Sequence, residues 1–150
     1  MTRLERAYLA GLFDGEGSIC ISRIRPNFKN RDRNPRYFLL IEIANTNRPI
    51  LEWIAASFGG RISLKSGRTS GARPCYAWHA SKAIAEKFLH AVRPYAKIKS
   101  AQIEVALEYR DTLATFKWHS KQPWTLNRSV QIKEQFRSKL RVLNHRQEVA

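Results

Sequence analysis

The sequence predicts a single α+β domain, and three observations predict it. A length of 150 residues suits one domain with a buried core. Short β-branched segments alternate with segments of good helix formers in the order α-β-β-α-β-β-α, and two further helices follow. The composition shows no low-complexity segment. We therefore treat residues 1–150 as one domain, with a core over about 1–115 and a helical extension over about 116–150.

The first helix is expected over residues 4–14, because good helix formers continue there without a proline. Gly15 and Gly17 are expected to end this helix. The next segment, "SICISRIR" at residues 18–25, is β-branched and roughly alternating, which predicts a strand.

A polar loop with several asparagines is expected over residues 26–35, and a second strand over residues 37–44. Because successive side chains of a strand point to opposite faces, the alternation in this segment separates two faces. One face carries Leu39, Ile41 and Ile43, and the other carries Arg36, Phe38, Leu40 and Glu42.

A second helix is expected after this strand. Asn47 has a residue type that caps helix starts, and Pro49 lies in the first turn, where its missing N–H costs little. The glycine pair that begins at Gly59 is expected to end the helix. Two short strands are expected beyond it, over residues 61–66 and 75–80.

Three more helices complete the expected order. Ser81 is expected to cap the third helix, which runs to about residue 92. The fourth is expected over residues 100–115 and the fifth over residues 128–144. The polar segment 117–127 is expected to be an ordered linker rather than a domain boundary.

The charge balance indicates a polyanionic partner. A formal net charge of +15 and a pI of about 10.5 favour DNA, RNA or an anionic membrane. A membrane is the weakest of the three, because the sequence has neither an apolar run of about 18 residues nor a signal-peptide pattern. Cys20 and Cys75 lack metal-binding or redox spacing, so we expect reduced thiols in an intracellular protein rather than a disulfide.

Basic residues gather in two runs, and each run spans an expected hairpin. A charge run often marks only a solvated face, but two runs at corresponding places favour a binding surface. The first run is Arg23, Arg25, Lys29, Arg31, Arg33 and Arg36, and the second is Arg61, Lys65, Arg68, Arg73 and Lys82.

Small residues recur at helical spacing in the first helix. Ala7, Gly11 and Gly15 lie four residues apart, so they share one face and let another helix backbone approach closely. The chain contains one copy of this pattern. We therefore expect the same helix of a second chain as its partner, in a twofold dimer.

Two carboxylates, Asp14 and Glu16, stand at the C-terminal end of this helix. The helix dipole disfavours negative charge at that end, and a dimer would bring the two Glu16 side chains together. A divalent cation relieves both effects, and oxygen ligands suit Mg²⁺. Beside a basic sheet, such a site suits metal-assisted phosphodiester hydrolysis. The alternative is that both acids are turn residues that satisfy local backbone donors.

The nine residues "LAGLFDGEG", at positions 9–17, resemble the motif of the LAGLIDADG homing endonucleases. Both glycines and the acid pair of the motif are in place, and the departures include Phe13 for isoleucine and Glu16 for aspartate. The α-β-β-α-β-β-α order is that family's core, so the resemblance covers about the first 110 residues. One copy of the motif is similar to the homodimeric branch of the family.

By this resemblance, Glu16 is a metal ligand and the backbone carbonyl of Gly15 is a second ligand. Asp14 resembles the structural acid that fixes the helix end. The family also places a polar amide at the end of the second strand. Here that residue is Asn45, with Asn47 as the alternative.

A basic residue follows the third helix in this family. Lys99 in "RPYAKIKSAQ" falls at that position, with Lys97 as the near alternative. Its expected role is to stabilise charge in the transition state or to position the attacking water. The resemblance therefore implies the catalytic set Glu16, Asn45 and Lys99.

The resemblance also implies a curved, four-stranded antiparallel sheet that lies in the major groove of DNA. The candidates in the first strand do not share one parity, so we expect a bulge near Ser22. Phe38 and Leu40 are unusual groove residues that either contact thymine methyls or indicate a different register. In the strand over 75–80, we assign the aromatic residues to the core and His79 to the groove. The DNA-binding candidates are Ser22, Arg23, Arg25, Asn27, Arg31, Arg33, Arg36, Phe38, Leu40, Glu42, Arg61, Ser63, Lys65, Arg68, Arg73 and His79.

As a function, the resemblance implies an intron-encoded, site-specific endonuclease that cuts double-stranded DNA as a homodimer. Its target is expected to be long and pseudo-palindromic. Mg²⁺ is the expected metal, with Mn²⁺ as a substitute and Ca²⁺ supporting binding without cleavage. Neither a membrane nor a small-molecule substrate is an expected partner. The alternative is a nucleic-acid-binding protein on the same fold that does not cleave, such as an intron-RNA maturase or a DNA-binding regulator.

Overall fold

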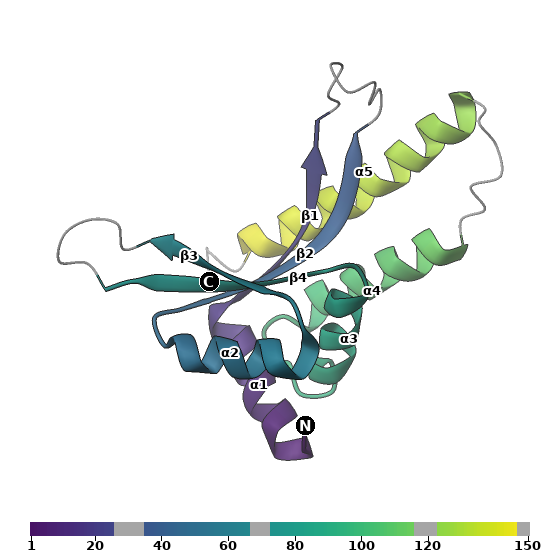
Figure 1. Ribbon diagram of the computed structural model, residues 1–150. Helices are drawn as coiled ribbons and strands as arrows, with labels where there is room; N and C mark the ends of the chain where they lie inside the picture. The colour runs from purple at the N-terminus through teal and green to yellow at the C-terminus, as the bar shows by residue number, and fades with distance from the viewer. Residues whose placement is uncertain (26–34, 67–72, 116–122, 147–150) are drawn as a thin grey trace.

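The computed structural model describes residues 1–25, 35–66, 73–115 and 123–146. The elements follow the expected order (Figure 1). Their bounds are α1 Arg3–Glu16, β1 Gly17–Ile24, β2 Arg36–Asn45, α2 Arg48–Phe58, β3 Arg61–Ser66, β4 Cys75–Ser81, α3 Lys82–Val92, α4 Ser100–Thr115 and α5 Pro123–Arg146.

The four strands form one antiparallel sheet in the order β1-β2-β4-β3. The long strand β2 therefore pairs with β1 on one side and with β4 on the other. The sheet twists, so the far ends of the β1–β2 and β3–β4 hairpins point away from each other (Figure 1). The expected α+β fold with a four-stranded antiparallel sheet is confirmed.

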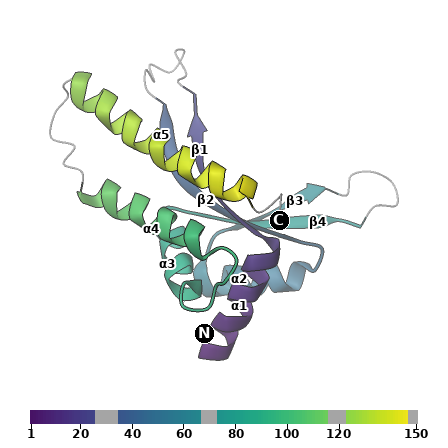
Figure 2. The same ribbon diagram turned by 180° about the vertical axis from the view of Figure 1, so that it is seen from behind.

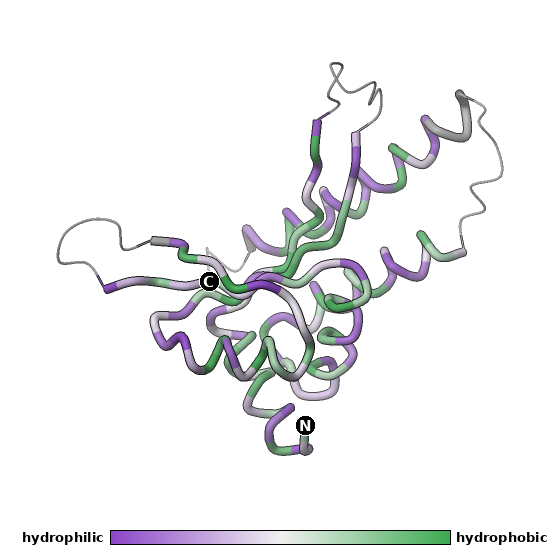
Figure 3. Tube along the Cα trace, in the orientation of Figure 1, coloured by the Kyte–Doolittle hydropathy of each residue, from purple (hydrophilic) through white to green (hydrophobic). Residues whose placement is uncertain are grey.

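One face of the sheet is apolar and covered by helices. Ile41 at the centre of β2 pairs with Ile19 of β1 and Ala80 of β4, and all three are buried. Seen from behind, α5 crosses in front of β1 and β2 (Figure 2), and hydrophobic residues lie along the middle of β2 (Figure 3). The alternation expected for β2 is confirmed, because Leu39, Ile41 and Ile43 are buried and the residues between them are not.

Phe88 of α3 joins the helices to the sheet in the core. Its ring centroid lies 5.0 Å from that of Phe13 in α1, 5.3 Å from Phe58 in α2 and 5.1 Å from Trp78 in β4. Aromatic pairs at these separations bury large apolar areas and favour tilted or edge contacts. The core therefore fixes α1, α2 and α3 against the same strand region.

The glycine pair after α2 has a structural reason. Gly59 and Gly60 have φ values of +86° and +99°, which L side chains rarely adopt. A Cβ at Gly60 would lie 2.6 Å from Nε1 of Trp78. That same Nε1 donates a hydrogen bond of 2.9 Å to the carbonyl of Gly59, so the turn locks α2 onto the core tryptophan.

Helix α1 is longer than expected, and this changes where its acids lie. The helix continues through Gly15 to Glu16, so the prediction that Gly15 ends it is wrong. Gly17 then begins β1 without an intervening loop. A Cβ at Gly17 would lie 2.1 Å from Cδ2 of Phe13, so a side chain at this junction would clash with the core. At the other end, Thr2 and Glu5 form a capping box.

Two later predictions need correction. Ser81 occupies the N-cap position of α3 but makes no side-chain capping hydrogen bond, because the chain turns through Lys82 at a φ of +54°. Helix α5 begins at Pro123, so residues 123–127 of the expected linker are helical. Proline is favourable in the first turn of a helix, where its missing donor costs little. The rest of that linker lies outside the described residues.

The bulge expected near Ser22 is also wrong. The β1–β2 pairing runs without a shift from Gly17 opposite Ile43 to Ile24 opposite Arg36. The candidates of β1 differ in parity because Arg23 lies on the helix-covered face, opposite Tyr37. The irregular pairing lies instead between β3 and β4, at residues 64–66.

Candidate functional site

The end of α1 is fixed by the buried carboxylate of Asp14. Its Oδ2 accepts hydrogen bonds from the backbone N–H groups of Lys97 at 2.7 Å and Ile98 at 3.1 Å, and its Oδ1 accepts one from Lys99 at 3.0 Å. Asp14 is 8% exposed. These bonds tie α1 to the segment before α4, which confirms the structural role expected for Asp14.

Lys99 is brought to the end of α1 by these contacts. Its side chain is buried, and its Nζ donates a hydrogen bond of 2.5 Å to the backbone carbonyl of Asp14. Burial lowers the pKa of Lys99, and the negative charges of Asp14 and Glu16 partly oppose that shift. The alternative residue, Lys97, is exposed. The structure therefore places the ammonium of Lys99 within the electrostatic reach of Glu16.

Glu16 is the last residue of α1 and is exposed to solvent. Its carboxylate stands at the negative end of the helix dipole, which favours a nearby positive charge. The following residue, Gly17, pairs with Ile43 of β2. Glu16 therefore lies where α1 meets the end of the sheet.

Asn45 ends β2 two residues beyond Ile43, at the same end of the sheet. Its Oδ1 accepts a hydrogen bond of 2.8 Å from the backbone N–H of Asn47. Asn47 has a different task, because its own Oδ1 accepts from the N–H of Ile50 and caps α2, as expected. Asn45 therefore lies at the end of β2, whereas Asn47 belongs to the cap of α2.

The oxygen donors at this end suit a hard divalent cation, but one chain supplies few of them. Among the residues that the structure describes, no group of three or more His, Cys, Asp or Glu side chains is arranged to hold a metal ion. Glu16 with the neighbouring Gly15 carbonyl is an oxygen donor set of the type that Mg²⁺ takes. A complete site at this position needs ligands from a second chain, from water or from a bound phosphate.

The open face is the face of the sheet opposite the one that the helices cover. It carries the expected groove residues Ser22, Arg36, Phe38, Leu40, Glu42, Arg61, Ser63, Lys65 and His79, as the strand registers and the Lys65–Glu42 contact show. Phe38 and Leu40 therefore lie on this face in the expected register of β2. The expected division of β4 also holds, with Trp78 buried and His79 on the open face.

The remaining candidates lie elsewhere. Arg25 and Arg73 are exposed next to β1 and β4. Arg23 lies on the helix-covered face, where its Nε is 3.3 Å from Oε1 of Glu134. Four candidates fall outside the described residues, namely Asn27, Arg31, Arg33 and Arg68.

Helix α5 packs along β1 and supplies contacts that the sequence did not indicate. Glu134 accepts a hydrogen bond of 2.7 Å from the hydroxyl of Tyr37, and it pairs with Arg23 and Arg137. The hydrogen bond from Tyr37 lowers the pKa of Glu134, although partial burial opposes the shift. Near the helix end, Asn144 donates a hydrogen bond of 3.0 Å to the carbonyl of Ile19. Apart from the Glu134–Arg137 pair within α5, these contacts join distant segments, so no local pattern predicts them.

The outer face of α1 is apolar and glycine-rich. Leu4 is 83% exposed and Tyr8 58% exposed, and Ala7, Gly11 and Gly15 are exposed between and beyond them. A Cβ added at Gly11 or Gly15 would meet nothing within 4 Å. Nothing in the described chain therefore requires a glycine at either position, although glycine is unfavourable inside a helix.

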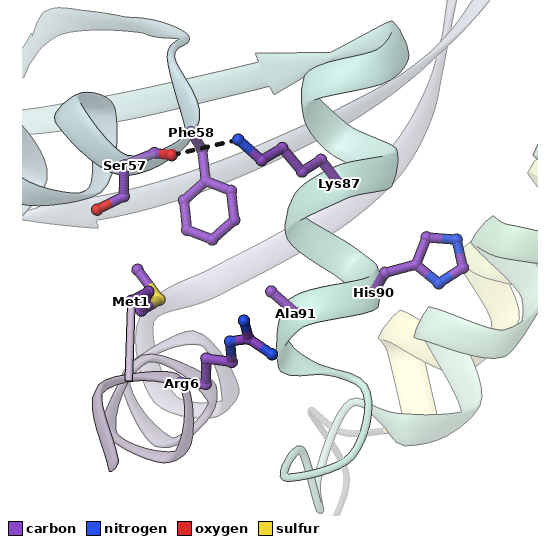
Figure 4. A pocket seen from close by; sticks show the side chains of 7 residues that line it. All are labelled: Met1, Arg6, Ser57, Phe58, Lys87, His90 and Ala91. Atoms are coloured by element: carbon purple, nitrogen blue, oxygen red, sulfur yellow. Dashed lines mark hydrogen bonds between the residues drawn. The ribbon is translucent and has the colours of Figure 1, made fainter. Parts of the chain in front are cut away.

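A pocket of about 390 Å³ lies at the opposite end of α1, between α1, α2 and α3 (Figure 4). Its polar lining comes from Arg6, Ser57, Lys87 and His90, and Lys87 donates to the carbonyl of Ser57 at 3.5 Å. The lining contains no carboxylate. Arg6 and Glu16 are ten residues apart in one helix, or about 15 Å along its axis. The pocket is therefore separate from the acids of the motif.

The family comparison covers most of the expected core. The family model described as LAGLIDADG endonuclease matches residues 9–106. A search of curated proteins finds no match. Within the described ranges, no helix is both long and apolar enough to cross a membrane.

Solved structures with the same fold are numerous at low identity. The homing endonuclease I-CvuI in complex with its target in the presence of Ca is 20% identical with a TM-score of 0.68, and the match covers 94% of this chain and 82% of that one. The archaeal intron-encoded homing endonuclease I-Vdi141I complexed with DNA is 22% identical with a TM-score of 0.65, covering 91% and 84%. The homing endonuclease I-TnaI is 14% identical with a TM-score of 0.62, covering 92% and 97%.

Proposed function

Because the chain belongs to the LAGLIDADG endonuclease family, we propose that it is a homodimeric, divalent-metal-dependent endonuclease that cuts double-stranded DNA at a specific site. The observation that carries this proposal is the junction at the end of α1. There Asp14 ties the segment of Lys99 to the helix that presents Glu16, at one end of a sheet with a cationic open face. The DNA-bound relatives named above support the choice of substrate.

Each residue at this junction has a proposed role in the hydrolysis. Glu16 and the carbonyl of Gly15 hold the metal, and a bound Mg²⁺ supplies Lewis-acid stabilisation of the charge that develops on the phosphodiester. Lys99 places a buried positive charge beside the scissile phosphate. Asn45 orients the water that attacks the phosphorus atom. Asp14 makes no contact with the substrate and fixes the geometry of the other residues.

The dimer is proposed to form through α1. Two chains related by a twofold axis would bring both α1 ends, and thus both Glu16 side chains, to the centre of one DNA site. The exposed stripe of α1 supports this arrangement, because a Cβ at Gly11 or Gly15 would meet no atom within 4 Å in the described part of the chain. Each subunit then cuts one strand, and the target is pseudo-palindromic.

DNA binding is proposed to occur in the major groove through the open face. Its candidate groove residues are Ser22, Arg36, Phe38, Leu40, Glu42, Arg61, Ser63, Lys65 and His79. The exposed residues Arg25 and Arg73 and the loop candidates Asn27, Arg31, Arg33 and Arg68 are assigned to outer bases or phosphates. Arg23 is assigned to the docking of α5 instead.

The competing function is binding without cleavage, by a maturase or a regulator on the same fold. The incomplete set of metal ligands in the described part of one chain is the observation that favours it. A Glu16→Gln variant separates the two functions. An endonuclease loses cleavage and keeps its DNA affinity, whereas a binding-only protein has no cleavage to lose.

The proposal is tested with a randomised duplex DNA library. Duplexes are selected for binding in Ca²⁺, Mg²⁺ is then added, and the ends of the products are sequenced. We expect the selection to recover a pseudo-palindrome that the wild type cuts on both strands near its centre. The wild type should also cut this sequence in Mn²⁺. The Glu16→Gln variant should bind the same sequence without cutting it. A selected motif that stays intact with the wild type in both metals would overturn the endonuclease and leave the binding-only function.

A further inference from the structure

Glu42 stands at the centre of the open face. The strand registers place Ser18 of β1 on one side of it, and His79 of β4 followed by Arg61 of β3 on the other. It is the sole carboxylate on the described part of this face. A carboxylate repels the phosphates of DNA, so its position in the middle of a DNA-binding surface needs an explanation.

Both oxygens of Glu42 are engaged by cationic or polarisable neighbours. Oε1 forms an ion pair with Nζ of Lys65, and Oε2 lies 3.5 Å from Nδ1 of His79. The other ring nitrogen of His79 lies 2.8 Å from the hydroxyl of Ser63. The side chains of Glu42 and His79 are only 24% and 20% exposed. The Glu42–His79 contact therefore lies in a partly desolvated setting, where charge pairing is stronger than in bulk water, whereas the side chain of Lys65 is 52% exposed.

Lys65 reaches Glu42 across a whole strand. Lys65 belongs to the edge strand β3, Glu42 belongs to β2, and β4 lies between them. The pairing of β3 with β4 is irregular between Leu64 and Ser66, which flank Lys65, and such irregularities re-aim side chains. The hydrogen bond to Glu42 raises the pKa of Lys65 above its ordinary value.

This arrangement prepares Lys65 for a particular contact. An ammonium group has three donors, and Glu42 accepts one of them. The side chain of Lys65 stays 52% exposed beside Glu42, and a lysine in the major groove pairs best with the O6 and N7 acceptors of guanine. A free lysine would have to be ordered when DNA binds, whereas one held by Glu42 is already ordered.

We propose that Glu42 is a positioning residue that holds Lys65 in place for readout of a guanine in each half of the target. The contact of Glu42 with His79, and of His79 with Ser63, fixes Glu42 in turn. This proposal rests on the DNA-binding function proposed above. Glu42 reduces the affinity for every DNA through its charge, and it reduces the affinity for non-target DNA more. The result is discrimination rather than tight binding.

The test compares the wild type with Glu42→Gln in Ca²⁺, by selection from the randomised library and by titration of target and non-target duplexes. We expect Glu42→Gln to bind non-target DNA several-fold more tightly and to lose about tenfold in the ratio of target to non-target affinity. The selected motif should lose its preference for guanine at one pair of symmetry-related positions. Glu52→Gln is the matched control, because it removes the same charge from an exposed residue of α2 paired with Arg48.

Two further measurements identify Lys65 as the residue through which Glu42 acts. In a Lys65→Ala background, Glu42→Gln should have little further effect on the affinity ratio. In the protein without DNA, the NMR titration of the Lys65 ammonium should move to lower pH in Glu42→Gln and stay unchanged in Glu52→Gln.

The outcomes separate this proposal from the function on which it rests. If Glu42→Gln changes the affinity for target and non-target DNA by the same factor, then Glu42 acts only by its charge, and the proposal is overturned. If Glu42→Gln loses affinity for both target and non-target DNA and has a lower thermal stability, then Glu42 has a structural role in the fold. That result would also overturn the proposal. If the wild type selects no motif at all, the DNA-binding function itself fails.

Discussion

Two acids that stand two residues apart in the motif have opposite environments. Asp14 is buried and accepts three backbone hydrogen bonds, whereas Glu16 is exposed at the helix end. We expect Asp14→Ala to lower the free energy of unfolding by about 3 kcal/mol, because buried N–H groups lose a charged acceptor. Glu16→Gln should leave the free energy of unfolding within about 0.5 kcal/mol of the wild type. Urea titrations measure both.

The control for this pair is Asp111→Ala on α4, where an exposed aspartate is removed. It should change stability by no more than about 0.5 kcal/mol. If Asp14→Ala were as mild as this control, the proposed fixing of the Lys99 segment by Asp14 would be wrong.

Lys99 is expected to cost stability at neutral pH. Its pKa is lowered in the folded protein because burial disfavours the charged form. The unfolded chain therefore binds the proton more tightly, and stability rises with pH between the lowered pKa and the unfolded value of about 10.4. We expect the free energy of unfolding of the wild type to increase relative to Lys99→Met as pH is raised from neutrality towards that value. If the free energies of unfolding of the wild type and Lys99→Met change in parallel with pH, the lowered pKa of Lys99 is contradicted.

Single residues also show where sequence reasoning stops. The motif at residues 9–17 indicated Asp14 and Glu16, whereas Lys99 was indicated only by the resemblance of the segment RPYAKIKSAQ to the family. The partners of Glu42 and Glu134 were not predicted. They come from strands and helices that meet only in the fold, such as Tyr37 and Glu134, which are 97 residues apart.

At the scale of an element, the glycines of α1 give a test with two opposite effects. Gly11→Ala should stabilise the helix by about 0.8–1.0 kcal/mol, because glycine is unfavourable in a helix interior and the structure leaves space for a Cβ. The same methyl group should weaken a dimer that needs close approach of two α1 helices. Thermal unfolding at low concentration measures the first effect, and sedimentation equilibrium measures the second.

Thr112→Ala is the control for Gly11→Ala, because it raises the helix propensity of α4 and leaves α1 unchanged. It should stabilise the chain without changing association. A Gly11→Ala variant that associates as strongly as the wild type would place the dimer contact somewhere other than α1.

The elements themselves were largely predictable. Alternation gave the faces of β2, and Asn47 and the glycine pair at 59–60 marked the two ends of α2. The end of α1 was misplaced because Gly15 has the residue type that usually stops a helix, whereas the helix continues to Glu16 beside the hydrogen bonds of Asp14 to residues 97–99. The first turn of α5 was missed because its polar sequence has no apolar periodicity.

At the scale of the whole molecule, the net charge of +15 is expected to govern how tightly the proposed DNA partner is held. If the dimer neutralises about 6–10 phosphates, its affinity should fall by about 10³ to 10⁵ between about 50 and 200 mM salt. Titrations of target and non-target duplexes over this range should give steep, nearly parallel lines in log K against log salt. A flat line for the target would mean that base contacts, rather than phosphate contacts, dominate the affinity.

The position of α5 along β1 has a consequence for how copies of the chain meet. β1 is an outer strand of the sheet, and the backbone carbonyl of Ile19 is already bonded to Asn144. The opposite outer strand, β3, has only six residues and carries Arg61 and Lys65. Short, cationic or covered edges discourage another chain from adding as a further strand. Edge-to-edge aggregation is thus disfavoured at both borders of the described sheet.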